Sequence, residues 1–132
     1  MGMGMGMGMD ERDPLTHEVI GAAIEVHREM GPGLLESVYQ DCMGLELKIR
    51  GLQFHARHKL PLVYKGNALP DPLEMDFYFP GLLVVEIKAV EQFHPVHEAQ
   101  LLTYLRLSNT KTGLLLNFNV PALKDGIKRM VL

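Results

Sequence analysis

LEMDFYFPGLLVVEIKAV, residues 73–90, joins two short apolar segments through Pro80 and Gly81. The first segment alternates, which predicts a strand with an apolar and a polar face: Leu73, Met75, Phe77 and Phe79 against Glu74, Asp76 and Tyr78. The second segment, 82–90, is almost continuously apolar, which is typical of a strand covered on both faces. Glu86 and Lys88 interrupt it on one face, at a cost of several kcal/mol unless a partner or a metal compensates. We therefore expect function in this stretch.

The length of the turn decides whether Asp76 and Glu86 can act together. In an antiparallel hairpin, directly opposed residues share a face, and a slip of one residue exchanges the faces. A two-residue loop would place Asp76 opposite Val85, on the wrong face from Glu86. We therefore predict an odd-numbered loop, 79–81 or 80–82, or a bulge at this turn. A regular two-residue hairpin would contradict a metal site shared by the two carboxylates.

Outward from this hairpin, periodicity and breaker residues predict the remaining elements. We expect helices over 14–30, 34–50 and 94–108, and strands over 52–65, 112–120 and 127–132. Pro61 breaks the 52–65 strand or displaces it to a sheet edge. The buried stripe expected on the second helix consists of Leu34, Leu35, Val38, Cys42, Leu45 and Ile49. The order αα-βββ-α-β(β) predicts a mixed α/β domain with helices packed on a small sheet.

Length and composition indicate one globular domain. The chain has 132 residues and a net charge of −3, so nucleic-acid binding would need a local basic patch. We interpret residues 1–9 as a flexible Met/Gly extension and 10–132 as a single domain. No apolar run reaches the roughly 18 residues of a membrane span, and the first residues lack the pattern of a secretion signal. The single cysteine, Cys42, fits a reducing compartment, so we expect a cytoplasmic protein, for which a homodimer is one expected assembly.

Asp76, Glu86 and Lys88 form the first candidate site. Two carboxylates from neighbouring strands offer the oxygen ligands that Mg²⁺ or Mn²⁺ prefers, and a lysine beside them can hold or help deprotonate a water. With the metal as Lewis acid, such a group is a minimal phosphodiester hydrolase. The alternative is a solvated hairpin face on which the charges form weak surface pairs.

Polar residues on two helices form a second candidate group. His97, Gln100 and Tyr104 fall on one stripe of the third helix, where they could reach a phosphate or hydrogen-bond only locally. Glu36 and Tyr39 share a face near the N-terminus of the second helix. The helix dipole favours a carboxylate there, which explains Glu36 without a function. A functional Glu36 would have to point toward the strand carboxylates.

Histidines and basic residues give weaker signals. His55 and His58 are an odd number apart on a predicted strand, so we expect them on opposite faces, and HPVHE at 94–98 lacks a zincin spacing. Both observations argue against zinc. The basic residues that could form a nucleic-acid footprint, or equally be scattered solvated charges, are Arg57, Lys59, Lys124, Lys128 and Arg129.

Together these motifs resemble the PD-(D/E)xK nuclease superfamily, and within it the small proteins named after a GxxExxY motif. GLLESVY, 33–39, is the naming motif as it stands here. Asp76 is followed nine residues later by VEIK, 85–88, which matches the D…ExK core. QLLTY, 100–104, is similar to the QxxxY motif of RecB-type members. Met75 departs from the pattern, since the superfamily name expects proline before the aspartate.

The resemblance implies a restriction-endonuclease-like α-β-β-β-α-β core, with a mixed four-stranded sheet flanked by helices. It implies that Asp76 and Glu86 ligate Mg²⁺, or alternatively Mn²⁺, with the backbone carbonyl of Ile87 as a further ligand. Lys88 would position the attacking water, and Glu36 would be an accessory acid. Gln100 and Tyr104 would contact the substrate backbone, and His97, from the same polar stripe, is our further candidate for substrate binding.

We therefore expect a Mg²⁺-dependent nuclease that hydrolyses phosphodiester bonds, with DNA as the expected substrate. The alternative is a catalytically silent module that kept the nuclease fold and binds nucleic acid or protein. The acidic net charge and the lack of a long basic segment motivate this alternative.

Overall fold

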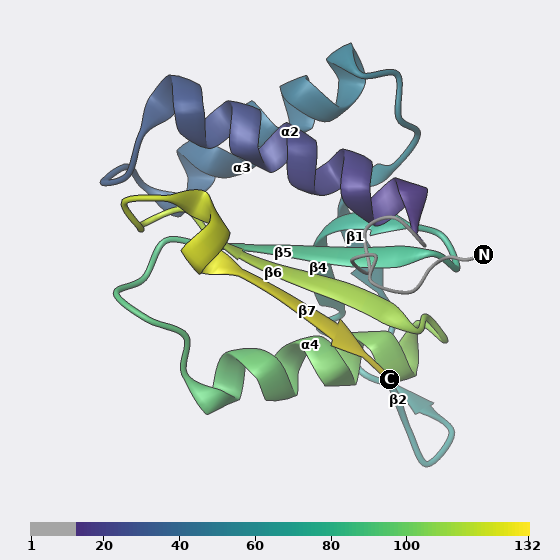
Figure 1. Ribbon diagram of the computed structural model, residues 1–132. Helices are drawn as coiled ribbons and strands as arrows, with labels where there is room; N and C mark the ends of the chain where they lie inside the picture. Colours follow the sequence, from purple (N-terminus) through teal and green to yellow (C-terminus); the bar gives the residue numbers. More distant parts are fainter. Residues whose placement is uncertain (1–12) are drawn as a thin grey trace, which may run out of the picture.

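The computed structural model describes residues 13–132, which form three α-helices and a five-stranded sheet (Figure 1). The helices are α2 (Pro14–Met30), α3 (Glu36–Ile49) and α4 (Pro95–Leu107). The strands of the main sheet are β1 (His55–Leu60), β4 (Leu73–Phe79), β5 (Leu83–Lys88), β6 (Thr112–Asn117) and β7 (Ile127–Val131). The predicted Met/Gly extension at 1–9, and the first residues of the predicted domain, lie outside the described residues.

The sheet has the order β1-β4-β5-β6-β7 and is mixed. β5 and β6 are parallel, joined by a crossover through α4, and all other neighbours are antiparallel. The predicted α-β-β-β-α-β core is present as α3-β1-β4-β5-α4-β6. The predicted number of four strands is one too low, because β7 pairs with β6 and extends the sheet.

Helices cover both faces of the sheet: α2 and α3 lie on one face and α4 on the other (Figure 1). β5 supplies side chains to both cores. Leu83, Val85 and Ile87 pack in the cluster under α2 and α3, whereas Val84 packs in the cluster under α4. This double coverage is the reason why the strand is almost continuously apolar, as predicted.

The first helix begins and ends as its sequence predicts. Asp13 is the N-cap and accepts a hydrogen bond from the backbone N–H of Thr16, and a proline follows it in the first turn. Gly31 ends the helix with a φ of 70°, a conformation that glycine adopts without steric cost.

The predicted buried stripe of the second helix is wrong for most of its residues, although Cys42 does pack against the core. Leu35, Leu45 and Ile49 are 73%, 62% and 77% exposed, and the fully buried residues are Tyr39, Met43 and Leu47. Tyr39 sets this rotation of α3. Its ring stacks on Phe118 with centroids 4.7 Å apart, and its hydroxyl donates to the carbonyl of Gly31 and accepts from the N–H of Leu34. These contacts of Tyr39 determine which face of α3 is buried, although the apolar pattern of the helix predicts another face.

The predicted 52–65 strand is divided at Pro61. β1 ends at Leu60, and the residues beyond form a separate hairpin of β2 (Val63–Tyr64) and β3 (Asn67–Ala68). The last connection contains a short 3₁₀ helix, η1 (Leu123–Gly126). Within residues 13–132, no helix has the length and apolar character that crossing a membrane requires.

Candidate metal-dependent site at a split hairpin

The turn between β4 and β5 has the predicted odd length. Phe79 pairs with Leu83 and Phe77 with Val85, which leaves the three residues 80–82 as the loop. The Leu82 N–H donates to the Phe79 carbonyl at 2.8 Å, and Gly81 has a φ of 74° after a proline, the pattern of a type II turn. The prediction of an odd loop is confirmed. One further pair in this register places Asp76 opposite Glu86.

Between Asp76 and Glu86, hydrogen bonds to side chains replace the hydrogen bonds between the two backbones. The strand pairing stops at Phe77 and Val85. Beyond it, the N–H of Asp76 donates to Glu86 Oε2 at 2.9 Å, and the N–H of Ile87 donates to Asp76 Oδ2 at 2.7 Å. The two strands are thus held slightly apart by their own carboxylates. Each carboxylate is fixed by a backbone N–H of the opposite strand.

The predicted alternation of the first strand is wrong beyond Asp76. Phe77 and Phe79 pack under α2 and α3, but Leu73 and Met75 pack under α4. The register between β4 and β1 is the same on both sides of Asp76. The side chains of both strands therefore exchange faces at the same position. The residue of β1 opposite Asp76 is Arg57, which has a φ of 52°. A left-handed residue interrupts the alternation of faces in β1.

The same kink corrects the prediction for His55 and His58. Their rings lie 5.3 Å apart and the ring of His58 lies 4.9 Å from that of Tyr78, so both histidines are on one face. The positive φ of Arg57 between them reverses the expected orientation. The alternation of side chains between the two faces of β1 therefore holds before Arg57 and after it, but not across it.

The two carboxylates are electrostatically costly where they lie. Burial, together with the charge of Glu36, raises the pKa of Asp76 to about 6, although the N–H of Ile87 and the charge of Lys88 act to lower it. Burial and the charge of Asp76 raise the pKa of Glu86 well above its ordinary value. Glu86 is only 4% exposed. A pair of buried acids that repel each other is an arrangement that a cation would relieve.

Lys88 and Gln100 face each other across the gap between β5 and α4. Lys88 Nζ lies 3.4 Å from Gln100 Oε1, and Lys88 shares a face of β5 with Glu86. Tyr104, one turn further along α4, is 5% exposed and hydrogen-bonds to Gln100. Burial and the charge of Glu86 raise the pKa of Tyr104 to about 12, so its hydroxyl stays protonated. Tyr104 thus borders the site from within the α4 cluster.

Glu36 and His97 lie at the margin of the site. Glu36, the first residue of α3, is exposed, and its charge acts on Asp76 and Glu86. Glu36 is exposed at the end of α3, whereas Tyr39, one turn further along the helix, is buried. His97 Nδ1 accepts from the N–H of His94 and caps α4, and burial together with the charge of Lys88 lowers its pKa. Its predicted contact with substrate stays a prediction.

The chemistry of the donors fits one hard divalent cation. Asp76 and Glu86 offer carboxylate oxygens, and each such oxygen keeps a second lone-pair direction after accepting one N–H. Residues 13–132 contain no group of three or more His, Cys, Asp or Glu side chains arranged for a metal. A Mg²⁺ here would use two carboxylates and complete its shell with water or a carbonyl, as Mg²⁺ commonly does. The carbonyl of Ile87 stays a predicted ligand.

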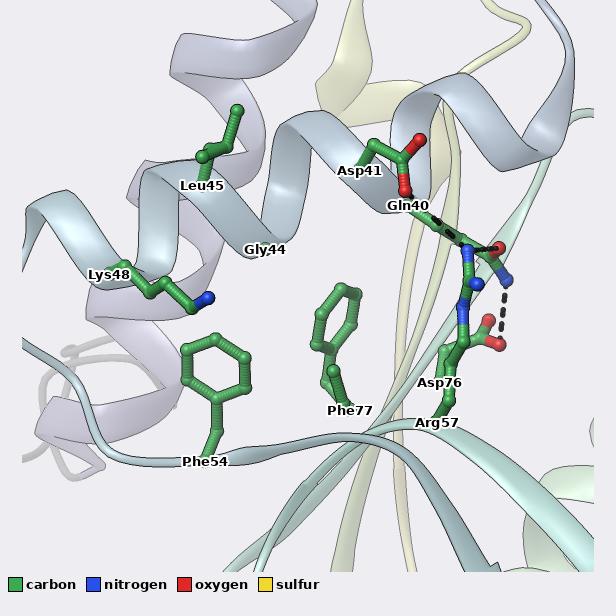
Figure 2. Close-up of a pocket in the computed structure, with 10 residues that line it drawn as sticks. Gln40, Asp41, Gly44, Leu45, Lys48, Phe54, Arg57, Asp76 and Phe77 are labelled. Atoms are coloured by element: carbon green, nitrogen blue, oxygen red, sulfur yellow. Dashed lines mark hydrogen bonds and ion pairs between the residues drawn. The ribbon is translucent and has the colours of Figure 1, made fainter.

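Sequence reasoning missed Gln40. Its Nε2 donates to Asp76 Oδ1 at 2.8 Å, and its Oε1 accepts from Arg57 at 3.3 Å (Figure 2). Gln40 lies four residues after Glu36, so both are on one face of α3. This spacing was the signal available in the sequence, and it becomes meaningful only once Glu36 is placed near the strands.

The five basic residues considered for a nucleic-acid footprint do not form one patch. Arg57 and Lys59 are on β1, whereas Lys128 and Arg129 are on β7, at the opposite edge of the sheet. Lys128 forms an ion pair with Glu98 at 2.9 Å. Arg57 is connected to Asp76 through Gln40, which contacts both residues.

Comparison with known proteins identifies the family of the chain. No curated protein and no solved structure matches it. A match to the PD-(D/E)XK nuclease superfamily covers residues 13–130, from the N-cap of α2 to the last strand. The match includes the split hairpin with Asp76, Glu86 and Lys88. The chain therefore belongs to the PD-(D/E)XK nuclease superfamily.

Proposed function

We propose that the protein is a Mg²⁺-dependent nuclease, with Mn²⁺ as an alternative ion, that hydrolyses phosphodiester bonds in DNA. One observation carries the proposal: Asp76 and Glu86 meet where β4 and β5 separate, with Lys88 on the same face as Glu86. Burial raises the pKa of both acids, and their hydrogen bonds to backbone N–H groups offset this cost only in part, whereas a bound cation would relieve it. Superfamily membership supports a nucleic-acid substrate.

In the proposed mechanism, Asp76 and Glu86 would hold the ion through their carboxylate oxygens. When bound, Mg²⁺ supplies a Lewis acid for the scissile phosphate and lowers the pKa of a nearby water. Lys88 orients this water and stabilises the charge that develops on the phosphate. Gln100 keeps Lys88 pointed into the site, since its Oε1 lies 3.4 Å from the ammonium. Glu36 orients water from the exposed side of the site.

We also propose the finer assignment to proteins with the GxxExxY motif, because each motif residue has a physical task. Gly33 has a φ of 98°, which favours glycine in the turn before α3. Tyr39 locks this turn through Gly31 and Leu34. Glu36 lies between them at the first position of α3, near the strand carboxylates. The expected homodimer and the cytoplasmic location stay predictions of this proposal.

A cleavage assay tests the proposed function. The full chain is incubated with plasmid DNA, single-stranded DNA and RNA, with Mg²⁺, Mn²⁺ or EDTA. We expect metal-dependent cleavage of DNA, and a loss of at least about a hundredfold in Asp76→Ala and in Lys88→Ala. Glu74→Gln, which removes an exposed acid of the same strand, is the matched control and should cleave normally. If all three nucleic acids stay intact with both metals, the proposal is wrong.

The alternative is a catalytically silent module that binds nucleic acid or protein with the same fold. The observation in its favour is that two carboxylates, rather than a group of three, meet at the hairpin within residues 13–132. The two proposals differ in one outcome. DNA binding that is unchanged in Asp76→Ala, without cleavage by the wild type, would favour the silent module.

A further inference from the structure

A groove leads away from Asp76 between α3 and the neighbouring strands β1 and β4 (Figure 2). It encloses about 390 Å³. The rings of Phe54 and Phe77 line one side of the groove. Gly44, which has no side chain, leaves space on the α3 side. A Cβ on Gly44 would contact the Phe77 ring at 3.6 Å, so a larger side chain there would occupy the space. None of these residues takes part in the proposed chemistry.

Cations lie at both ends of this groove. Arg57 is at the end beside Asp76, and Lys48 points toward the groove near Phe54 at the other end (Figure 2). No salt bridge within residues 13–132 involves Lys48. An adjoining hollow of about 620 Å³ on the same sheet edge has no acidic residue in its lining. The basic residues of that hollow are Lys48, His55, Arg57, His58 and Lys59.

Arg57 is held in an unfavourable backbone conformation at this position. Its φ of 52° is uncommon for a residue with a side chain and is a form of local strain. Its guanidinium donates to Gln40 Oε1 at 3.3 Å and to Asp41 Oδ1 at 3.5 Å. Both groups of the ion pair with Asp41 are more than half exposed, so this contact is weak and can be exchanged for a phosphate. Gln40 links Arg57 directly to Asp76.

We propose that this groove binds an unpaired nucleotide of the substrate strand, next to the phosphate that is cleaved. Arg57 binds a phosphate in place of Asp41, and Lys48 binds a neighbouring one. A base stacks on the half-buried ring of Phe54, as bases do on aromatic residues of single-strand sites. α3 lines the groove opposite β1 and β4, so the proposed occupant is a single strand between these two walls (Figure 2). The inference rests on the proposed function, because the strand must reach Asp76.

Binding of a labelled twelve-nucleotide single strand, measured by fluorescence anisotropy in EDTA, tests this inference without cleavage. Arg57→Gly removes the side chain, and glycine tolerates the positive φ, so the variant should fold. Because it lacks the cation that contacts a phosphate, it should bind the strand about tenfold more weakly than the wild type. Asp41→Asn removes the competing carboxylate and should bind more tightly. Arg28→Ala is the matched control, since Arg28 is an exposed arginine with carboxylate partners on α2. Its affinity should stay near that of the wild type.

Each outcome decides one point. Equal effects on DNA and RNA strands assign the groove to the shared phosphodiester, and an effect on one of them assigns it to that nucleic acid. Unchanged binding by Arg57→Gly, or preference for the duplex, overturns the inference. If the wild type cleaves DNA but Arg57→Gly binds the strand as tightly as the wild type, the inference about the groove is wrong and the proposed function stands. If binding depends on Arg57 but the wild type cleaves nothing, the proposed function is wrong and the inference that the groove binds a strand stands.

Discussion

Replacing Asp76 by asparagine should stabilise the metal-free protein at pH 8. In the folded protein the pKa of Asp76 is raised from 3.8 to about 6, mainly by burial. An acid whose pKa is raised by folding binds its proton more tightly in the folded state, so the free energy of unfolding falls as pH rises through this range. At pH 8, the ionised Asp76 therefore costs on the order of 3 kcal/mol.

Asparagine removes this charge but loses part of the hydrogen bonding. Asp76 accepts from the N–H of Ile87 and from Gln40 Nε2, and an asparagine oxygen can satisfy one of these donors. The lost hydrogen bond costs about 1 kcal/mol. The net gain expected for Asp76→Asn is therefore about 1 to 2 kcal/mol at pH 8. The gain should shrink toward pH 5, where the wild-type carboxyl is largely protonated in the folded state.

Urea unfolding followed by far-ultraviolet circular dichroism, in EDTA at pH 8 and pH 5, measures both quantities. Glu74→Gln is the control, because this exposed acid lies on the same strand and its replacement should change stability little. If Asp76→Asn is no more stable than the wild type at pH 8, the electrostatic reasoning fails. An equal gain at both pH values would assign the effect to something other than the raised pKa.

Three further substitutions test parts of the fold that position the site, each by the free energy of unfolding in urea. Tyr39→Phe should cost about 1 to 2 kcal/mol, since the hydroxyl serves both the Gly31 carbonyl and the Leu34 N–H; an unchanged stability would contradict its anchoring of α3. Gly81→Ala should cost about 1 kcal/mol because of the φ of 74° at the hairpin turn, and no loss would mean that the turn adapts. Gly44→Ala should instead gain up to about 1 kcal/mol from helix propensity, since its Cβ meets only ordinary contacts; a loss would show that the α3 wall is already full.

The order and type of the main elements could be predicted from the sequence, because local patterns determine them. Asp13 and Gly31 mark the ends of the first helix by capping alone. The odd loop at 80–82 followed from one condition, that Asp76 and Glu86 face each other. Such features depend on few residues close in sequence.

The parts that could not be predicted depend on long-range contacts. The rotation of α3 is set by Tyr39 against Phe118, residues far apart in the chain, and this pairing overrides the apolar stripe. The reversal of strand faces depends on Arg57 and Asp76 changing together across two strands. Gln40 acquires its contact with Asp76 only through the packing of α3 over the sheet. Periodicity within one element does not reveal any of these three long-range contacts.

Calorimetric titration of the full chain with Mn²⁺ tests the central claim most directly, because the proposed chemistry requires an ion between Asp76 and Glu86. We expect one Mn²⁺ per chain for the wild type and for the Glu74→Gln control. Glu86→Gln keeps the size of the side chain but removes its charge, and should weaken binding at least tenfold. A wild type that binds no Mn²⁺, or a Glu86→Gln variant that binds it equally well, would contradict the account.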